Sequence, residues 1–286
     1  MSYCSPRKHT SKTCLSLSEL QSVAAQYNHE NPNSPIPTAL FKRPSLLTKA
    51  LSDKFKNCPK NADYCWLQNL ESQTLYNKLK SNYRPLEPSS WEQNKREWLT
   101  NYDILYVMKQ YEQLYSSFMF LGVFPIDFAE NDVCHLNNIC NFSAKQIIEG
   151  KKKYFGMVLN LDKHNEPGSH WVSLFCCLDP SSVQYGVCYF DSGASKPPAL
   201  VRKFLKTIYD ELGSPKEFVK KYNTKRKQFQ GTECGVFSIL FLEKCLENPR
   251  IKYRKIREKI KSDRNDNIIH SYRKVFWQPR IKKKFI

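Results

Sequence analysis

The chain has 286 residues, 41% of them apolar and 13% aromatic, which suffices to bury a core in one large domain or two small ones. This composition excludes a mainly disordered chain, and no apolar run approaches the ~18 residues of a membrane-spanning helix. The formal net charge is +18, and residues 251–286 hold 13 Lys/Arg against 3 Asp/Glu. This basic C-terminal segment is either a solvated charged helix or a docking site for DNA or another polyanionic core component.

The chain contains 11 cysteines, an odd number, and no CxxC pair. We therefore expect neither a zinc ribbon nor a disulfide scaffold, and predict reduced thiols in a cytosol-like compartment. Cys134, His135 and Cys140 form the one cluster with metal-ligand chemistry, but they lack a fourth ligand and the usual spacing. No metal and no cofactor are expected.

The first part of the chain has a helical pattern. Residues 1–45 are polar and interrupted by proline, with a short amphipathic helix expected over 15–27. Residues 46–115 carry apolar residues at helical spacing, and a helix over 101–118 would be capped by Thr100 or Asn101. We predict a mostly helical N-terminal arm over residues 1–115, which either recognises the substrate or caps a catalytic core.

The pattern changes after residue 150. Three short runs rich in apolar and β-branched residues predict successive strands, at residues 154–161, 171–179 and 183–191. An amphipathic helix over 198–212, a basic extended stretch over 218–229 and an apolar, buried helix over 234–247 follow. Residues 116–286 are therefore predicted to form an α+β core that includes the basic C-terminal segment.

Four residues at the ends of these elements meet the requirements of a thiol nucleophile. Cys234 begins the buried helix, where the helix dipole stabilises a thiolate, and His170 at the head of a strand can supply an imidazolium. Asp191, at the end of a later strand, can orient that imidazole. The Gln228 amide and the Cys234 backbone N–H suit an oxyanion. Each residue alone is more often structural; together they predict a cysteine peptidase.

Other residues compete for these roles. Gln230 is a second glutamine before Cys234. Asp179 also ends a strand, but it follows Trp171 on the same strand and is therefore a poorer partner for His170. Cys65 precedes a tryptophan as a papain-type nucleophile does, but no glutamine stands six residues earlier. Cys65 is therefore rejected as the nucleophile, whereas Gln230 and Asp179 remain alternatives at this point.

His-Trp-Val, a strand ending in Asp, and Gln-x5-Cys-Gly, in this order, resemble the Ulp1/SUMO-protease and adenovirus-protease superfamily of cysteine peptidases. Within it the chain is similar to the polyprotein-processing protease of African swine fever virus. The matching segments are 155–160, 168–172, 189–192 and 232–235. The viral enzyme has asparagine in the place of Asp191, which cellular SUMO proteases share; either side chain can orient an imidazole.

The resemblance implies a papain-like, Ulp1-type core with a central mixed sheet flanked by helices, and the order His170, Asp191, Gln228, Cys234. It implies cleavage after Gly-Gly, with Trp171 and Asn160 at the substrate.

We expect a cysteine endopeptidase that processes viral structural polyproteins at Gly-Gly-X sites during maturation, in the virion and the host cytoplasm. One alternative is a protease that removes SUMO or ubiquitin-like modifiers. The other is a basic, nucleic-acid-binding virion protein with a decayed protease fold.

Overall fold

The computed structural model describes residues 3–6, 13–59, 62–130, 133–135 and 139–280. The chain divides into two compact units, residues 1–89 with 274–286, and residues 90–273. The division therefore falls before the predicted boundary at residue 115, because helix α5 (Asn101–Leu114) packs on the strand that follows it, β1 (Phe118–Phe124). The last six residues of the basic C-terminal segment, 281–286, lie outside the described residues.

The first unit is helical, as predicted. Helix α1 opens with a capping box in which Ser16 and Glu19 each bond the other's backbone N–H. Its buried face, with Leu20 and Val23, joins a core that includes Leu47 and Leu51 of α2. The helices and 3-10 turns are α1 (Leu17–Glu30), η2 (Thr38–Leu40), α2 (Pro44–Lys54), α3 (Tyr64–Asn69), α4 (Gln73–Leu79), η3 (Lys80–Asn82) and η4 (Ser89–Glu92), the last of which crosses into the second unit.

Six cysteines are joined in disulfides, so the prediction of reduced thiols was wrong for them. The pairs are Cys4–Cys14, Cys58–Cys65 and Cys134–Cys140, with Cα–Cα distances of 5.1, 5.7 and 4.8 Å. These distances are within the ordinary range for a disulfide. Each bond closes a loop of 6 to 10 residues, and the absence of CxxC carries no information about such loops. Among the described residues, five cysteines are free and buried: Cys176, Cys177, Cys188, Cys234 and Cys245.

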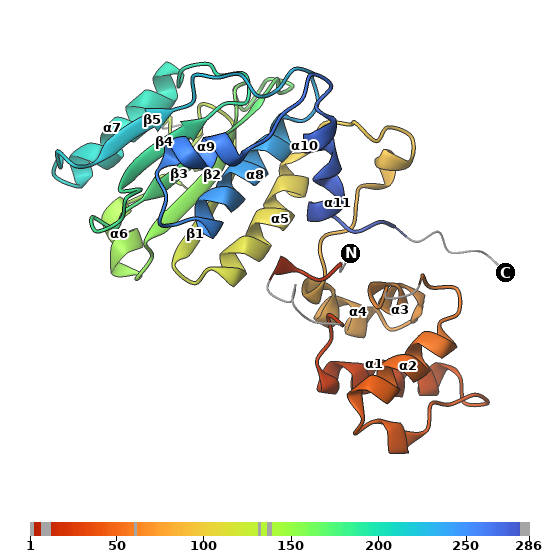
Figure 1. The fold of residues 1–286 in the computed structure, drawn as a ribbon. Coiled ribbons are helices and arrows are strands. Elements are labelled where there is room, and N and C mark those ends of the chain that lie inside the picture. The colour runs from red at the N-terminus through yellow and green to blue at the C-terminus, as the bar shows by residue number, and fades with distance from the viewer. Residues whose placement is uncertain (1–2, 7–12, 60–61, 131–132, 136–138, 281–286) are drawn as a thin grey trace. The chain divides into compact units, whose positions relative to one another are not determined.

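A five-stranded mixed sheet in the order β1-β2-β3-β4-β5 forms the centre of the second unit (Figure 1). The strands are β1, β2 (Tyr154–Asn160), β3 (Trp171–Cys177), β4 (Gly186–Phe190) and β5 (Val219–Tyr222). The central pairs are antiparallel, and both edge strands run parallel to their neighbours. The three strands predicted in chain order are confirmed as β2, β3 and β4. The sequence analysis missed β1. Buried and partly buried residues alternate along this strand, and it directly follows the amphipathic helix α5.

Helices cover both faces of this sheet (Figure 1). On one face, α6 (Ala144–Glu149) and α7 (Ala199–Glu211) pack on a core that includes Phe155 and Val172. On the other, α8 (Cys234–Glu247) lies against β3, and its Phe241 stacks on Phe190 at 4.7 Å. Further short helices are α9 (Tyr253–Lys259), α10 (Asn267–Ser271) and α11 (Arg273–Phe276). No helix among the described residues is both long and apolar enough to cross a membrane.

Helix α8 is buried along nearly its whole length, as its apolar sequence predicted. Its one buried carboxylate, Glu243, accepts a hydrogen bond of 2.6 Å from the Tyr111 hydroxyl of α5. At its start, a Cβ on Gly235 would lie 2.9 Å from the Leu99 side chain, so glycine allows the segment before α5 to approach the helix. Close packing thus fixes the N-terminal end of α8, where Cys234 lies.

Candidate active site

The sheet topology brings three predicted site residues to one end of the second unit. β3 and β4 are antiparallel, with Ser173 opposite Phe190, so the residues before β3 lie beside those after β4. His170 immediately precedes β3, and Asp191 immediately follows β4. α8 packs on β3 and begins at Cys234. A histidine, an aspartate and a cysteine from three separate elements therefore meet.

His170 and Asp191 form a direct pair, with 2.7 Å between His170 Nε2 and Asp191 Oδ1. The carboxylate also accepts the backbone N–H groups of Gly193 at 2.7 Å and Ser195 at 2.9 Å. Asp191 is buried, and burial alone would raise its pKa; the bonds from His170 and the two amides outweigh burial and lower it. The aspartate is therefore an anion at neutral pH and can hold the imidazole in one orientation.

The other ring nitrogen of His170, which does not contact Asp191, is available for a hydrogen bond with Cys234. Burial lowers the pKa of His170. Hydrogen bonds to Asp191 and Cys234, together with the charges of these two residues, have the larger effect and raise the pKa to about 9. Cys234 is 1% exposed and is the first residue of α8. A protonated imidazole next to a thiol at a helix N-terminus is the environment that stabilises a thiolate. The structure thus brings His170, Asp191 and Cys234 together.

Gln228 is held by bonds at both ends of its amide. Ser192 donates its hydroxyl to Gln228 Oε1 at 2.6 Å, and Gln228 Nε2 donates to the carbonyl of Gln230 at 2.6 Å. One amide hydrogen remains for another acceptor. The competing Gln230 is exposed, and its side chain donates to the Arg264 carbonyl, 3.0 Å away. The structure thus favours Gln228.

Two residues near the site were missed by the sequence reasoning. Ser192 is buried and fixes the Gln228 amide, and its carbonyl accepts the N–H groups of Lys227 and Gln228. Asn223, also buried, accepts the N–H of Asp191 at 2.9 Å and donates to the Asp191 carbonyl. Ser192 lay within a quoted motif, but its bond joins residues 36 apart in sequence, which no local pattern reveals.

Trp171 and Asn160 lie opposite each other in the β2–β3 pair and line a cleft of about 560 Å³. The indole of Trp171 donates to the Leu99 carbonyl at 2.9 Å, so its ring is fixed. Asn160 Oδ1 accepts the N–H groups of Asp162 and Ser169, which braces the turn before His170. Other lining residues come from the segment before α5, the end of β1 and the β2–β3 turn: Trp98, Leu99, Thr100, Asn101, Val123, Phe124, Pro125, Lys163, His164, Glu166, Pro167 and Gly168.

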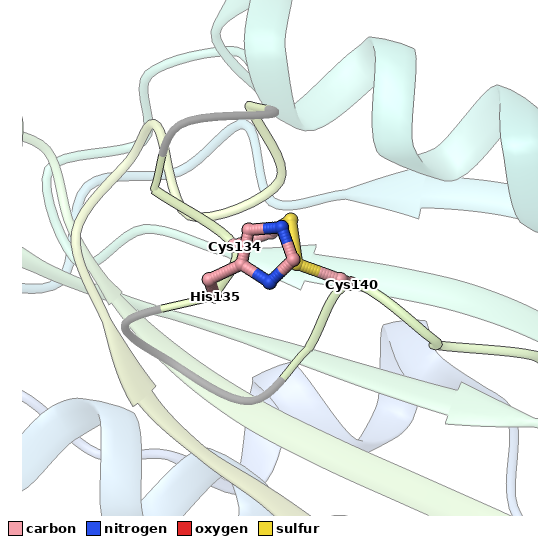
Figure 2. Close-up of side chains that lie close together, drawn as sticks. All are labelled: Cys134, His135 and Cys140. Carbon is pink, nitrogen blue, oxygen red and sulfur yellow. A yellow bond between two sulfur atoms is a disulfide. The ribbon is translucent and has the colours of Figure 1, made fainter.

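The remaining sequence alternatives have other structural roles. Asp179 pairs with Lys153 at 2.9 Å, and Cys65 is bonded to Cys58. The imidazole of His135 lies across the Cys134–Cys140 disulfide (Figure 2). Sulfurs joined in that bond are not thiolates, so the cluster cannot act as a thiolate site while the disulfide is formed.

The fold and this constellation define a cysteine peptidase of the α+β class. Residues 147–271 match the model of the Ulp1 protease family, C-terminal catalytic domain. R355 of Acanthamoeba polyphaga mimivirus, whose name proposes a thiol protease, is 27% identical over 86% of this chain and 85% of its own length.

Cysteine protease S273R of African swine fever virus (isolate Tick/Malawi/Lil 20-1/1983) is 28% identical over 54% of this chain and 60% of its own length. A crystal structure of the African swine fever virus pS273R protease superposes with a TM-score of 0.66, at 18% identity, over 98% of this chain and 96% of that one. The chain is thus a cysteine protease of the Ulp1 and S273R type, and the predicted fold class is confirmed.

Proposed function

We propose that Cys234, His170, Asp191 and Gln228 are the catalytic residues of a cysteine endopeptidase. The observation that carries this is the hydrogen-bonded row from Asp191 through His170 to Cys234 at the start of α8. In acylation, the Cys234 thiolate attacks the substrate carbonyl, whose developing oxyanion lies near the Gln228 amide and the Cys234 backbone N–H. The His170 imidazolium gives its proton to the leaving amine, and then as a neutral base activates water for deacylation.

The substrate class we propose is a protein with a Gly-Gly-X site. Leu99 and Trp171 are joined by a hydrogen bond, and both line the cleft beside His170. We propose that the two glycines pass beneath this immobile indole, in a passage that accepts glycine and rejects a Cβ. We expect a Gly-Gly-X peptide library to be cut after the second glycine, and alanine at either glycine to lower kcat/KM by at least about tenfold.

Trp171→Ala would open this passage, so it should narrow the difference between glycine and alanine substrates. The check is kcat/KM for matched peptides with Gly-Gly, Ala-Gly and Gly-Ala before the scissile bond, with Cys234→Ser as the blank. Equal rates for all three peptides in the wild-type protein would contradict Gly-Gly specificity while leaving the peptidase intact.

Processing of a viral structural polyprotein is the biological role we propose, in the virion and at assembly sites in the host cytoplasm. It is supported by the sequence similarity to the viral thiol and cysteine proteases. Cleavage of a SUMO or ubiquitin-like conjugate is the alternative. Comparing kcat/KM for a purified polyprotein and a modifier conjugate separates the two, and faster cleavage of the conjugate would favour deconjugation.

A second proposed function, polyanion docking, is supported by a basic hollow of about 230 Å³ beside α9. Its lining includes Lys225, Lys227, Arg254 and Arg257 against a single carboxylate, Glu258. Lys227 is partly buried, and burial together with the charge of Lys225 lowers its pKa. Like charges held together at a hollow attract a phosphate-bearing polymer such as DNA.

Reversing charge in the hollow with Lys225→Glu and Arg254→Glu should weaken binding to a duplex oligonucleotide and make the plot of log affinity against log salt less steep by about one for each lost contact. Lys206→Glu with Lys203→Glu, two exposed lysines of α7, is the control with the same net charge. Equal binding by both double variants, or binding insensitive to salt, would remove this docking site.

A further inference from the structure

The loop that carries Gln228 to Cys234, here called the oxyanion loop (residues 228–233), is tied down at its beginning by a buried carboxylate. Asp266 accepts the backbone N–H of Phe229 at 3.0 Å and that of Gln230 at 2.7 Å. Asp266 is fully buried and has a left-handed backbone, with φ of 53°. Its neighbour Arg264 accepts from the Gln230 side chain through its carbonyl. Residues 264–266 of the basic C-terminal segment thus hold the loop.

The end of the oxyanion loop is held from the same segment. Glu233, directly before Cys234, is fully buried, and its carboxylate contacts two basic side chains of this segment as well as Arg96 Nη1 at 3.9 Å. His270 Nδ1 lies 2.9 Å from one carboxylate oxygen, and Arg273 Nε donates to the other at 2.9 Å. Arg273 is itself fixed by a bond to the Glu97 carbonyl and by the Trp91 ring, 4.5 Å from its guanidinium carbon.

These contacts extend to the Gln228 amide through one intermediate. Asp266 holds the Gln230 N–H, and the Gln230 carbonyl accepts from Gln228 Nε2 at 2.6 Å. The direction of the Gln228 amide therefore depends on where Asp266 places the backbone of Gln230, whose N–H and carbonyl belong to successive peptide groups. A donor acts on a developing oxyanion only when it is held in place before the reaction.

We propose that Asp266, together with His270 and Arg273, positions the oxyanion loop, so that the C-terminal segment is part of the catalytic apparatus and not only a charged surface. This rests on the proposed role of Gln228. Asp266 is a positioning residue because it acts through Gln230 and Gln228. His270 and Arg273 fix Glu233, and with it the backbone N–H that follows at Cys234.

Asp266→Asn is the central test. An amide keeps one acceptor but turns a donor toward the loop's N–H groups, so at least one bond is lost. We expect kcat for a Gly-Gly peptide to fall by roughly 10- to 100-fold, less than the roughly 10²- to 10³-fold loss of an entire oxyanion donor. Affinity for a Gly-Gly peptide aldehyde, whose adduct carries an oxyanion, should fall with it. Alkylation of Cys234 by iodoacetamide forms no oxyanion and should change less than about twofold.

Glu211→Gln is the matched control. Glu211 lies on α7 and its carboxylate also accepts backbone N–H groups, from Ala144 and Lys145, but none from the oxyanion loop. We expect it to leave cleavage, aldehyde affinity and alkylation unchanged. In a Gln228→Ala background, Asp266→Asn should cost much less than in the wild type, because the donor it positions is gone.

Unchanged cleavage by folded Asp266→Asn would overturn the proposal. An alkylation rate that falls as much as kcat would also overturn it, because that result indicates general damage to the site. A loss of kcat in the Gln228→Ala background as large as that in the wild type would overturn it as well. If Asp266→Asn does not fold, His270→Ala decides, because that side chain is 27% exposed. A kcat loss of a few-fold with unchanged alkylation supports positioning, and unchanged kcat rejects it. A Gln228→Ala protein with full activity would instead refute the proposed oxyanion role.

Discussion

Replacing Cys234 with alanine is expected to lower kcat for a Gly-Gly substrate by a factor of roughly 10⁶, the loss typical of removing a covalent nucleophile from a working triad. Cys234→Ser should be nearly as inactive, because a hydroxyl next to His170 forms the anion far less readily than a thiol. The measurement is single-turnover cleavage of a purified substrate, with circular dichroism to show that both variants fold. Cleavage by Cys234→Ala at the wild-type rate would place the reaction elsewhere.

Selective labelling of Cys234 supplies an independent check. All five free cysteines among the described residues are buried, but Cys234 alone lies beside His170. Burial raises the pKa of the other four thiols, that of Cys188 to about 12. They should react slowly near neutral pH. Cys234 should be labelled faster than a free thiol and should slow in His170→Ala. Labelling no faster than a free thiol, with or without His170, would contradict the activated nucleophile.

Where the sequence predicted structure well, each element had a signal of its own. The three apolar runs predicted β2, β3 and β4 because their side chains are buried almost throughout, and α8 was recognised because it is apolar on all sides. β1 was missed because an alternating pattern beginning at Phe118 directly follows the helical face of α5, without proline between them. The predicted boundary at residue 115 follows α5, because the packing of α5 on β1 and α8 is a tertiary property that no local pattern shows.

Three of the four proposed site residues, His170, Asp191 and Cys234, could be brought together from the sequence because each stands at an end of an element, where the order of strands and helix restricts its position. Gln228 lies in the loop between β5 and α8 and was singled out by its spacing to Cys234. The residues that hold them were not predictable in the same way. Ser192 contacts Gln228 across 36 residues, and Asp266 contacts Gln230 across the same separation. Neither bond leaves a periodic or spacing signal. The disulfides were not predicted for a different reason. Cysteines that pair across short loops without a CxxC motif look in the sequence like scattered free cysteines.

Replacing Asp191 tests the other half of the catalytic pair. Asp191→Ala removes the acceptor of the His170 bond and leaves the Gly193 and Ser195 N–H groups without the carboxylate. Loss of imidazole orientation should lower kcat by roughly 10³- to 10⁴-fold, by analogy with the aspartate of the serine-protease triad. Asp191→Asn keeps one acceptor for the imidazole and should retain more activity at its best pH. An Asp191→Ala protein as active as wild type would remove Asp191 from the machinery.

The pH dependence of Asp191→Asn distinguishes charge from orientation. In the wild type His170 keeps its proton up to about pH 9, so kcat/KM should fall as pH rises through about 9. Without the carboxylate's charge the pKa of His170 falls, because burial now opposes the imidazolium with less compensation, and the alkaline limb should move toward lower pH. Profiles that overlay within error would show that Asp191 acts by geometry alone.

The same shift has a consequence for folding stability, whose sign is fixed by linkage. The pKa of His170 is higher in the folded protein than the usual ~6.5, so protonation favours the folded state. Its stabilising contribution is complete below about pH 6.5 and is lost as pH rises through about 9. Urea unfolding at pH 6 and pH 9.5 should therefore show a larger loss of stability for wild type than for Asp191→Asn. A loss of equal size in both proteins would mean that another group, and not the His170–Asp191 pair, titrates in this range.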